Sequence, residues 1–149
     1  MNTEMQLFSI SRKKKPEYEH GVAHKVYENK LNQDFHANAI NQKWCTDFTY
    51  LFLTDGSKRY NCTIIALHDR SVIASITDKS MSKAGYPYDN APMERYYNTL
   101  KNELINHHYY HSEKELYASI EEFAYVHYNH ERPHSYNNYK TPFEARYGV

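Results

Sequence analysis

The strongest constraint on the fold is an aromatic and β-branched run at residues 44–52, followed within three residues by Asp55-Gly56. A run of this composition predicts a β-strand, and Asp-Gly between two such runs is a strong signal for a hairpin. Residues 60–67 supply the returning strand, and residues 71–77 form a third short run rich in β-branched side chains. Sequential strands with short turns predict a three-stranded antiparallel meander in the first half of the chain.

The second half of the chain has the spacing of helices. Residues 91–107 follow Asn90, which we expect to cap the helix, and have Pro92 in the first turn. Residues 113–129 predict a second helix, and Thr-Pro-Phe-Glu at 141–144 is a capping box that opens a short terminal helix. The apolar residues near one face of the second helix are Leu116, Ile120, Phe123 and Tyr128. Strands followed by helices predict an α+β fold.

The composition is that of a single folded domain without a strong charge bias. Of 149 residues, 40% are hydrophobic and 24% are charged, and 18 Lys and Arg balance 18 Asp and Glu. The balance argues against a strongly basic protein that coats DNA, and it leaves room for an enzyme with a local basic path. Two cysteines, Cys45 and Cys62, are too few for a disulfide framework, and no apolar run is long enough to span a membrane. We therefore expect a cytoplasmic protein with no membrane partner.

Residues 1–43 are polar and mixed, which predicts an N-terminal arm or linker ahead of a folded region at 44–149. The arm contains the basic run Arg12–Lys15, which Pro16 closes. Such a run is either a solvated part of the arm or a leader that contacts phosphates.

Asp47 and Glu94 are candidates for a metal site. Asp47 interrupts an apolar and aromatic strand, where an acidic residue is disfavoured, and Glu94 lies in the first turn of a predicted helix. A strand acid and a helix acid on one face supply the carboxylate oxygens that Mg²⁺ prefers in sites for phosphoryl transfer. Lys101 follows Glu94 by two helical turns and falls on the same helix face, where a cation can contact a phosphate backbone.

Each of these residues also has a structural explanation when it is considered alone. Asp47 fits an outward-facing strand position, because alternate strand residues point to water. Glu94 fits a negative charge at the positive end of a helix, and Lys101 fits an ordinary surface lysine. The residues by themselves leave both interpretations open.

Three stretches of the sequence resemble a known family. They are residues 80–105 (SMSKAGYPYDNAPMERYYNTLKNELI), residues 41–49 (NQKWCTDFT) and residues 128–134 (YNHERPH). All three are similar to motifs of bacterial insertion-sequence transposases with a retroviral-integrase-like catalytic core, and Thr141-Pro142 extends the likeness. The resemblance therefore covers most of the chain after the first part of the arm.

The resemblance implies a ribonuclease-H-like fold and DDE chemistry, in which three carboxylates hold divalent metal while DNA is nicked and a 3′-hydroxyl is joined to target DNA. Asp47 matches the first acid and Glu94 the third, so both are implied ligands of Mg²⁺ or Mn²⁺. Lys101 matches a basic residue beyond the glutamate and is an implied DNA contact. The implied partners are the insertion-sequence ends, target DNA, and a second copy or a full-length transposase.

The sequence departs from the family pattern at the second acid. The family carries this aspartate in a His-Ser-Asp-x-Gly context well before the glutamate, and the chain contains no such motif. We expect an internal deletion with its join near Lys79-Ser80, which removes a helix, the strand with the second acid, and another helix. The expected architecture is an incomplete integrase core, in which the third strand is left as an unprotected edge.

We expect the loss of one carboxylate to disable the site. Mg²⁺ needs near-ideal coordination, so two acids should bind it weakly, and catalysis should fall by orders of magnitude or vanish. The expected function is therefore a DNA transposase core protein that is catalytically defective.

Two alternatives to this function remain open. One is a non-enzymatic DNA-binding or partner protein that interferes with full-length transposase. The other is a small structure-selective nuclease, in which Asp69 or Asp78 replaces the missing acid.

Overall fold

The computed structural model describes residues 32–80 and 90–149 of the chain. The basic run at 12–15, the remainder of the arm before residue 32, and residues 81–89 of the family motif at 80–105 lie outside the described residues. The described part of the predicted arm, residues 32–43, contains no helix or strand and leads into the sheet.

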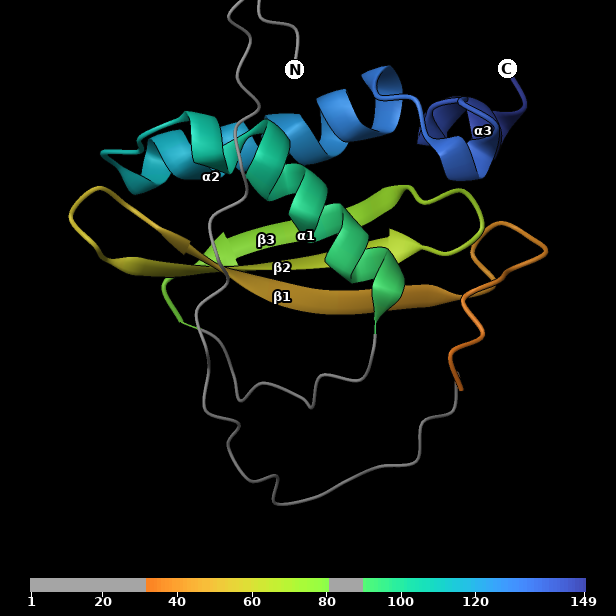
Figure 1. Cartoon of the computed structure of the whole chain (residues 1–149), viewed down its shortest axis with the longest axis horizontal. Coiled ribbons are helices and arrows are strands. Elements are labelled where there is room, and N and C mark those ends of the chain that lie inside the picture. The colour runs from red at the N-terminus through yellow and green to blue at the C-terminus, as the bar shows by residue number, and fades with distance from the viewer. Residues whose placement is uncertain (1–31, 81–89) are drawn as a thin grey trace, which may run out of the picture.

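Three antiparallel strands form one sheet, in the order β1-β2-β3 (Figure 1). They are β1 (Trp44–Phe52), β2 (Lys58–Ala66) and β3 (Val72–Asp78). The Asp55-Gly56 turn joins β1 to β2, and Gly56 has a φ of 81°, a left-handed conformation that glycine adopts without steric cost. The predicted meander is confirmed, with a register shift between Ile64 and Ile65 where β2 pairs with β3.

Helices follow the strands, as the sequence predicts. They are α1 (Ala91–Glu103), the 3₁₀ turn η1 (Ile105–His107), α2 (Glu113–Glu121), η2 (Glu122–Glu131), the 3₁₀ turn η3 (Ser135–Asn137) and α3 (Pro142–Tyr147). The helix predicted at 91–107 ends earlier, at Glu103, and its last residues form η1. The capping box is confirmed, because the Glu144 N–H donates to the Thr141 hydroxyl and the Thr141 N–H donates to the Glu144 carboxylate.

Asn90 does not cap α1 with its side chain, so that prediction is wrong. Its Nδ2 instead donates to the carbonyl oxygen of Thr46 in β1, at 3.2 Å. β1 is an edge strand of the sheet that the structure describes, and Thr46 lies on it. A tertiary hydrogen bond has therefore replaced the local cap. Pro92 lies at the start of α1 as predicted.

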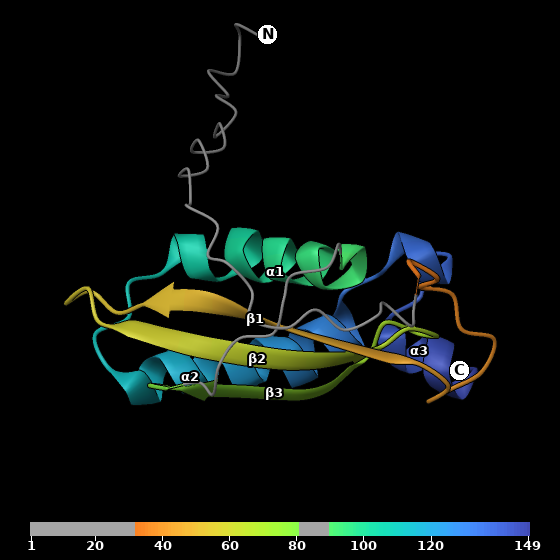
Figure 2. The ribbon, with the colours of Figure 1, turned by 90° about the horizontal axis from the view of Figure 1, so that it is seen from below.

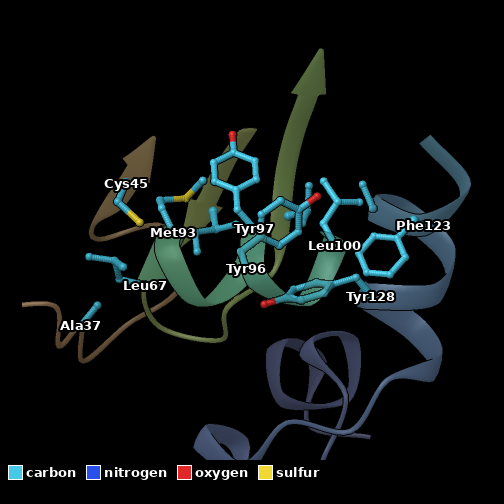
Figure 3. Close-up of a cluster of buried hydrophobic side chains, with 12 residues drawn as sticks. Ala37, Cys45, Leu67, Met93, Tyr96, Tyr97, Leu100, Phe123 and Tyr128 are labelled. Carbon is cyan, nitrogen blue, oxygen red and sulfur yellow. The ribbon is translucent and has the colours of Figure 1, made fainter. Parts of the chain in front are cut away.

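Helix α1 lies across one face of the sheet, and α2 with η2 runs along its β3 side (Figure 2). The inner face of α1 buries Met93, Tyr96, Tyr97 and Leu100. Tyr96 meets Tyr128 of η2 edge to face, with ring centroids 4.9 Å apart (Figure 3). The main core thus lies between the sheet, α1 and η2.

η2 continues α2 as a π-helix, in which hydrogen bonds join residues five positions apart. At its end the Arg132 N–H donates to the His127 carbonyl at 2.8 Å. This winding brings Phe123 and Tyr128 to the same buried side, although α-helical spacing would separate residues five apart. The predicted buried residues of the helix at 113–129 are confirmed, since Leu116, Ile120, Phe123 and Tyr128 are all buried. The π-helical winding of its second part was not predicted.

The outer edge of β3 is covered by η2, so the expectation of an unprotected third strand is wrong. The Asn129 side chain accepts a hydrogen bond from the Val72 N–H at 2.8 Å and donates one to the Val72 carbonyl at 3.0 Å. The Ser75 N–H donates to the Tyr125 hydroxyl at 2.8 Å. These side chains satisfy backbone groups that a further strand would otherwise pair.

Candidate metal site

Asp47 lies in the middle of β1, on the face that α1 covers. The alternate residues Cys45, Thr49 and Leu51 on this face are buried, and Asp47 itself is half-buried. Its Oδ1 accepts a hydrogen bond from the Phe48 N–H at 2.8 Å. Asp47 is therefore not the outward-facing strand acid that its position alone allowed.

The charge state of Asp47 depends on its surroundings. Burial raises the pKa of its carboxyl, the hydrogen bond from the Phe48 N–H lowers it, and the negative charge of Glu94 raises it further. The two carboxylates are thus close enough to interact electrostatically. Repulsion between them favours a cation or a proton at the site.

Two side chains fix the start of α1 beside Asp47. Asn90 donates to the Thr46 carbonyl at 3.2 Å, and the Tyr97 hydroxyl donates to the Asp47 carbonyl at 2.6 Å. Glu94 lies between these two anchors in the sequence, in the exposed first turn of the helix. Anchoring on both sides of Glu94 fixes the first part of α1 against β1 near Asp47.

Lys101 lies in the last turn of α1 and is half-buried. It follows Glu94 by seven positions, so the helical period places both on the same side of α1. Glu94 and Lys101 thus lie along one flank of α1, beside the strand that carries Asp47.

Asp69 has a structural position. Its side chain is fully buried, and Oδ2 accepts a hydrogen bond from Arg146 at 2.8 Å. Oδ1 accepts from the Ser71 N–H at 2.8 Å and from the Ser71 hydroxyl, and the Asp69 carbonyl accepts from the Asn137 amide at 2.8 Å. Both carboxylate oxygens are thus bonded within the fold, which opposes a role for Asp69 as a replacement acid.

Asp78 lies at the end of β3, where it pairs with Tyr60. Asp47 pairs with Thr63, which in turn pairs with Ser75. Asp78 is therefore two strands and three register positions away from Asp47, roughly 14 Å by strand geometry, and on the opposite face of the sheet. The two carboxylates cannot share one metal ion in this arrangement.

Two of the candidate acids, Asp47 and Glu94, lie on the elements that meet here, β1 and α1. Within residues 32–80 and 90–149, no group of three His, Cys, Asp or Glu side chains could hold a metal ion. Mg²⁺ keeps several waters and is commonly bound by one or two carboxylates together with substrate phosphates. The described residues around Asp47 and Glu94 therefore lack the third carboxylate of a two-metal site.

Sequence reasoning missed two residues that organise this region. Tyr97 belongs to the apolar face of α1, and nothing in that pattern reveals that its hydroxyl reaches β1. Arg146 is 77 residues from Asp69, so no local signal connects them. The sequence signal for Asn90 pointed to a helix cap instead of a contact with β1.

Residues 76–142 match the family described as "Integrase core domain". The matched stretch begins in β3 and ends at the start of α3, so it includes Glu94 and Lys101. Asp47 lies before it.

The chain is similar to parts of longer proteins. It is 40% identical over 86 residues to the transposase for insertion sequence element IS904 of Lactococcus lactis, which covers 58% of this chain and 31% of that protein. It is 29% identical over 167 positions to transposase InsF for insertion sequence IS3A of Escherichia coli, which covers 78% of this chain and 57% of InsF. A Lactococcus lactis protein named "ATP-dependent protease" is 48% identical over 63 residues, which cover 42% of this chain and only 20% of that protein. In each of these matches the chain spans less than two thirds of the relative.

No solved structure matches the chain. Among the helices that the structure describes, none is both long and apolar enough to cross a membrane.

Proposed function

Because the chain is a relative of insertion-sequence transposases and matches part of the integrase core domain, we propose that it is a transposase core protein that acts on DNA. The class of reaction is metal-dependent phosphoryl transfer in DNA transposition. The observation that carries the proposal is the convergence of Asp47 and Glu94 where α1 is anchored to β1.

The proposal includes an internal deletion in the core, at 44–149, with its join near residues 79–80. The alignment with InsF counts 167 positions, whereas 78% of 149 residues is about 116, so about 50 positions have no residue of this chain. A segment of about that length accommodates two helices, a strand and their connections. The alignment thus supports the loss of a segment of that size.

The face of the sheet opposite α1 also supports a missing segment. Trp44, Phe52 and Ile76 share this face and are 50%, 56% and 68% exposed. A layered α+β domain normally buries such side chains under a further element.

Asp47 and Glu94 would hold a single Mg²⁺ or Mn²⁺, and Lys101 would contact a DNA phosphate beside it. A bound divalent ion supplies positive charge that stabilises the developing charge in phosphoryl transfer. Without a third acid we expect weak metal binding and a rate that is orders of magnitude below that of a complete site.

The test measures metal binding and DNA cleavage separately. Mn²⁺ titration followed by electron paramagnetic resonance should show weak binding that Asp47→Asn and Glu94→Gln each abolish. Asp55→Asn, in the β1–β2 turn, is the matched control and should bind Mn²⁺ like the wild type. Efficient cleavage of terminal-repeat DNA that Asp47→Asn abolishes would refute the catalytic defect, and Mn²⁺ binding that neither variant changes would refute the site.

The two-acid site favours a second candidate function, a DNA-binding protein that associates with full-length transposase and does not cleave. Salt-dependent binding to terminal-repeat DNA without cleavage, in Mg²⁺ or Mn²⁺, would favour this candidate. A decrease in the cleavage activity of a complete transposase when this chain is added would identify that protein as the partner.

A further inference from the structure

A cavity of about 610 Å³ lies between α1 and the segment that follows η2. Its described lining includes three arginines, Arg70, Arg95 and Arg132, and no acidic residue. A volume of this size is within the range of small-molecule sites. We call it the arginine cavity.

Two of the three arginines in the arginine cavity lack an acidic partner. Arg132 is bonded to the Glu103 carboxylate through Nε at 2.9 Å and Nη2 at 2.8 Å. Among the described residues, by contrast, no carboxylate forms an ion pair with Arg70 or Arg95. The cavity therefore has an uncompensated positive charge on its wall, which favours an anion.

Buried polar atoms in the wall also lack partners. Within the described part of the chain, neither Arg70 Nη1 nor His134 Nε2 has a hydrogen-bond partner, although both atoms are buried. His134 is only 8% exposed. Buried donors and acceptors are normally satisfied, so these two atoms leave unmet hydrogen-bonding capacity within the wall, although atoms without accessible surface do not themselves face the cavity.

Arg70 is held in place by its neighbours. Its guanidinium lies 3.9 Å from the ring centroid of Tyr136, and Nη2 donates to the Phe35 carbonyl at 3.3 Å. The backbone of Arg70 is left-handed, with a φ of 63°, which is uncommon for a residue other than glycine. Asp69, next to it, is tied to both Asn137 and Arg146, so the turn that presents Arg70 is fixed to the C-terminal part of the chain.

Aromatic side chains lie beside these cations. Tyr136 is 45% exposed and Tyr139 is 76% exposed, and both line the arginine cavity. Exposed aromatic rings next to cations are the combination with which proteins bind single-stranded nucleic acid, since bases stack on the rings and phosphates meet the cations.

We propose that the arginine cavity binds one unstacked nucleotide, with its phosphate on Arg70 and Arg95 and its base against Tyr136. The nucleotide is either free or a unit of an unpaired DNA strand, because bases within a duplex are stacked and cannot enter a cavity. The site is separate from the metal site, since Arg95 and Thr99 face the cavity whereas Glu94 and Lys101 lie on another side of α1.

The test uses fluorescence anisotropy of a labelled, 5′-phosphorylated single-stranded oligonucleotide in EDTA, so that binding does not depend on a metal. Arg95→Ala should weaken binding about tenfold through loss of a charge-assisted hydrogen bond. Arg95 is exposed and forms no ion pair in the described structure, so this variant should fold normally. Lys114→Ala, an exposed cation of α2 outside the cavity, is the matched control and should bind like the wild type.

A second variant tests whether the base stacks on Tyr136. Tyr136→Leu should weaken binding about tenfold through loss of stacking. dAMP should displace the oligonucleotide better than deoxyadenosine or inorganic phosphate, because only dAMP has both a base and a phosphate. Equal affinity of dAMP and the oligonucleotide identifies a site for free nucleotides, and tighter binding of the oligonucleotide identifies a site for a strand.

Several results would overturn the proposal. If Arg95→Ala and Tyr136→Leu both bound the oligonucleotide with wild-type affinity, the arginine cavity would not be the binding site. Displacement by inorganic phosphate as effective as that by dAMP would leave an anion site without base recognition. Lys101→Ala should not change this affinity in EDTA, so a loss in that variant would assign the binding to the flank of α1 that carries Glu94 and Lys101 and keep the two hypotheses distinguishable.

Discussion

The buried ion pair between Asp69 and Arg146 connects the turn before β3 to the last helix, and its removal should weaken the whole domain. The Asp69 side chain is 0% exposed and that of Arg146 is 14% exposed, with 2.8 Å between Oδ2 and Nη1. The substitution Asp69→Asn keeps an oxygen that can accept from the Ser71 N–H. It removes the charge and leaves Arg146 without its anion.

The magnitude follows from burial. Removal of one partner of a buried ion pair costs about 3–5 kcal/mol, because the other charge is left uncompensated in a poorly solvated place. Arg146 keeps a hydrogen bond to the Asn41 side chain at 2.5 Å, so we expect the lower end of this range, about 3 kcal/mol. For a domain of about 100 residues, that loss lowers Tm by about 12 °C or more.

Urea unfolding followed by far-ultraviolet circular dichroism measures the free energy of unfolding directly. Asp34→Asn is the matched control, because it removes the same charge from an ion pair with Lys43 in which the Asp34 side chain is 62% exposed. Solvent screens exposed pairs, so this variant should change stability far less. If Asp69→Asn and Asp34→Asn were equally stable, the argument that burial makes the Asp69–Arg146 pair essential would be refuted.

Three further predictions concern titration and reactivity. Burial raises the pKa of Asp47 in the folded protein above 3.8, so the wild type loses stability as pH rises from 3.8 through the raised pKa. Asp47→Asn should therefore be more stable than the wild type at neutral pH. Urea unfolding should show that this gain disappears near pH 3.8. Burial, with a contribution from the charge of Arg132, lowers the pKa of His134 from 6.5 to about 4, so its neutral form stabilises the fold above pH 6.5. Stability should therefore fall as pH drops from 6.5 toward about 4, and His134→Asn should flatten this part of the profile; an unchanged profile would contradict the assignment. Burial raises the pKa of Cys45 to about 12, whereas Cys62 is exposed, so a thiol reagent should modify Cys62 quickly and Cys45 only on unfolding.

Local patterns in the sequence predict the elements of this fold, but not the contacts between distant elements. The Asp55-Gly56 turn and the capping box at Thr141 depend on residues a few positions apart, and the structure has both. Asn90 shows the limit, because the same amide that suits a helix cap is used by a strand 44 residues earlier. Tertiary hydrogen bonds of this kind are decided by packing, which a local pattern does not contain.

Asp47 was a candidate because it has a local signal in the sequence. An acid inside an apolar strand stands out in the sequence, and Asp47 is indeed half-buried beside α1. The arginine cavity had no such signal, since Arg70, Arg95 and Tyr136 come from a turn, a helix and a 3₁₀ turn that only the complete fold brings together.

The π-helical winding of η2 restricts how this segment can change by insertion during evolution. Phe123 and Tyr128 are buried together because hydrogen bonds in η2 join residues five positions apart, and Asn129 reaches Val72 from the same turn. Loss of one residue between positions 123 and 128 would place Phe123 and Tyr128 four positions apart, and α-helical winding would then keep both on the buried side. Gain of one residue would place them six positions apart, which would turn Tyr128 away from the core and withdraw Asn129 from β3. Substitutions at exposed positions such as Glu122 leave this spacing intact, so the segment should accept changes of residue type far more freely than insertions.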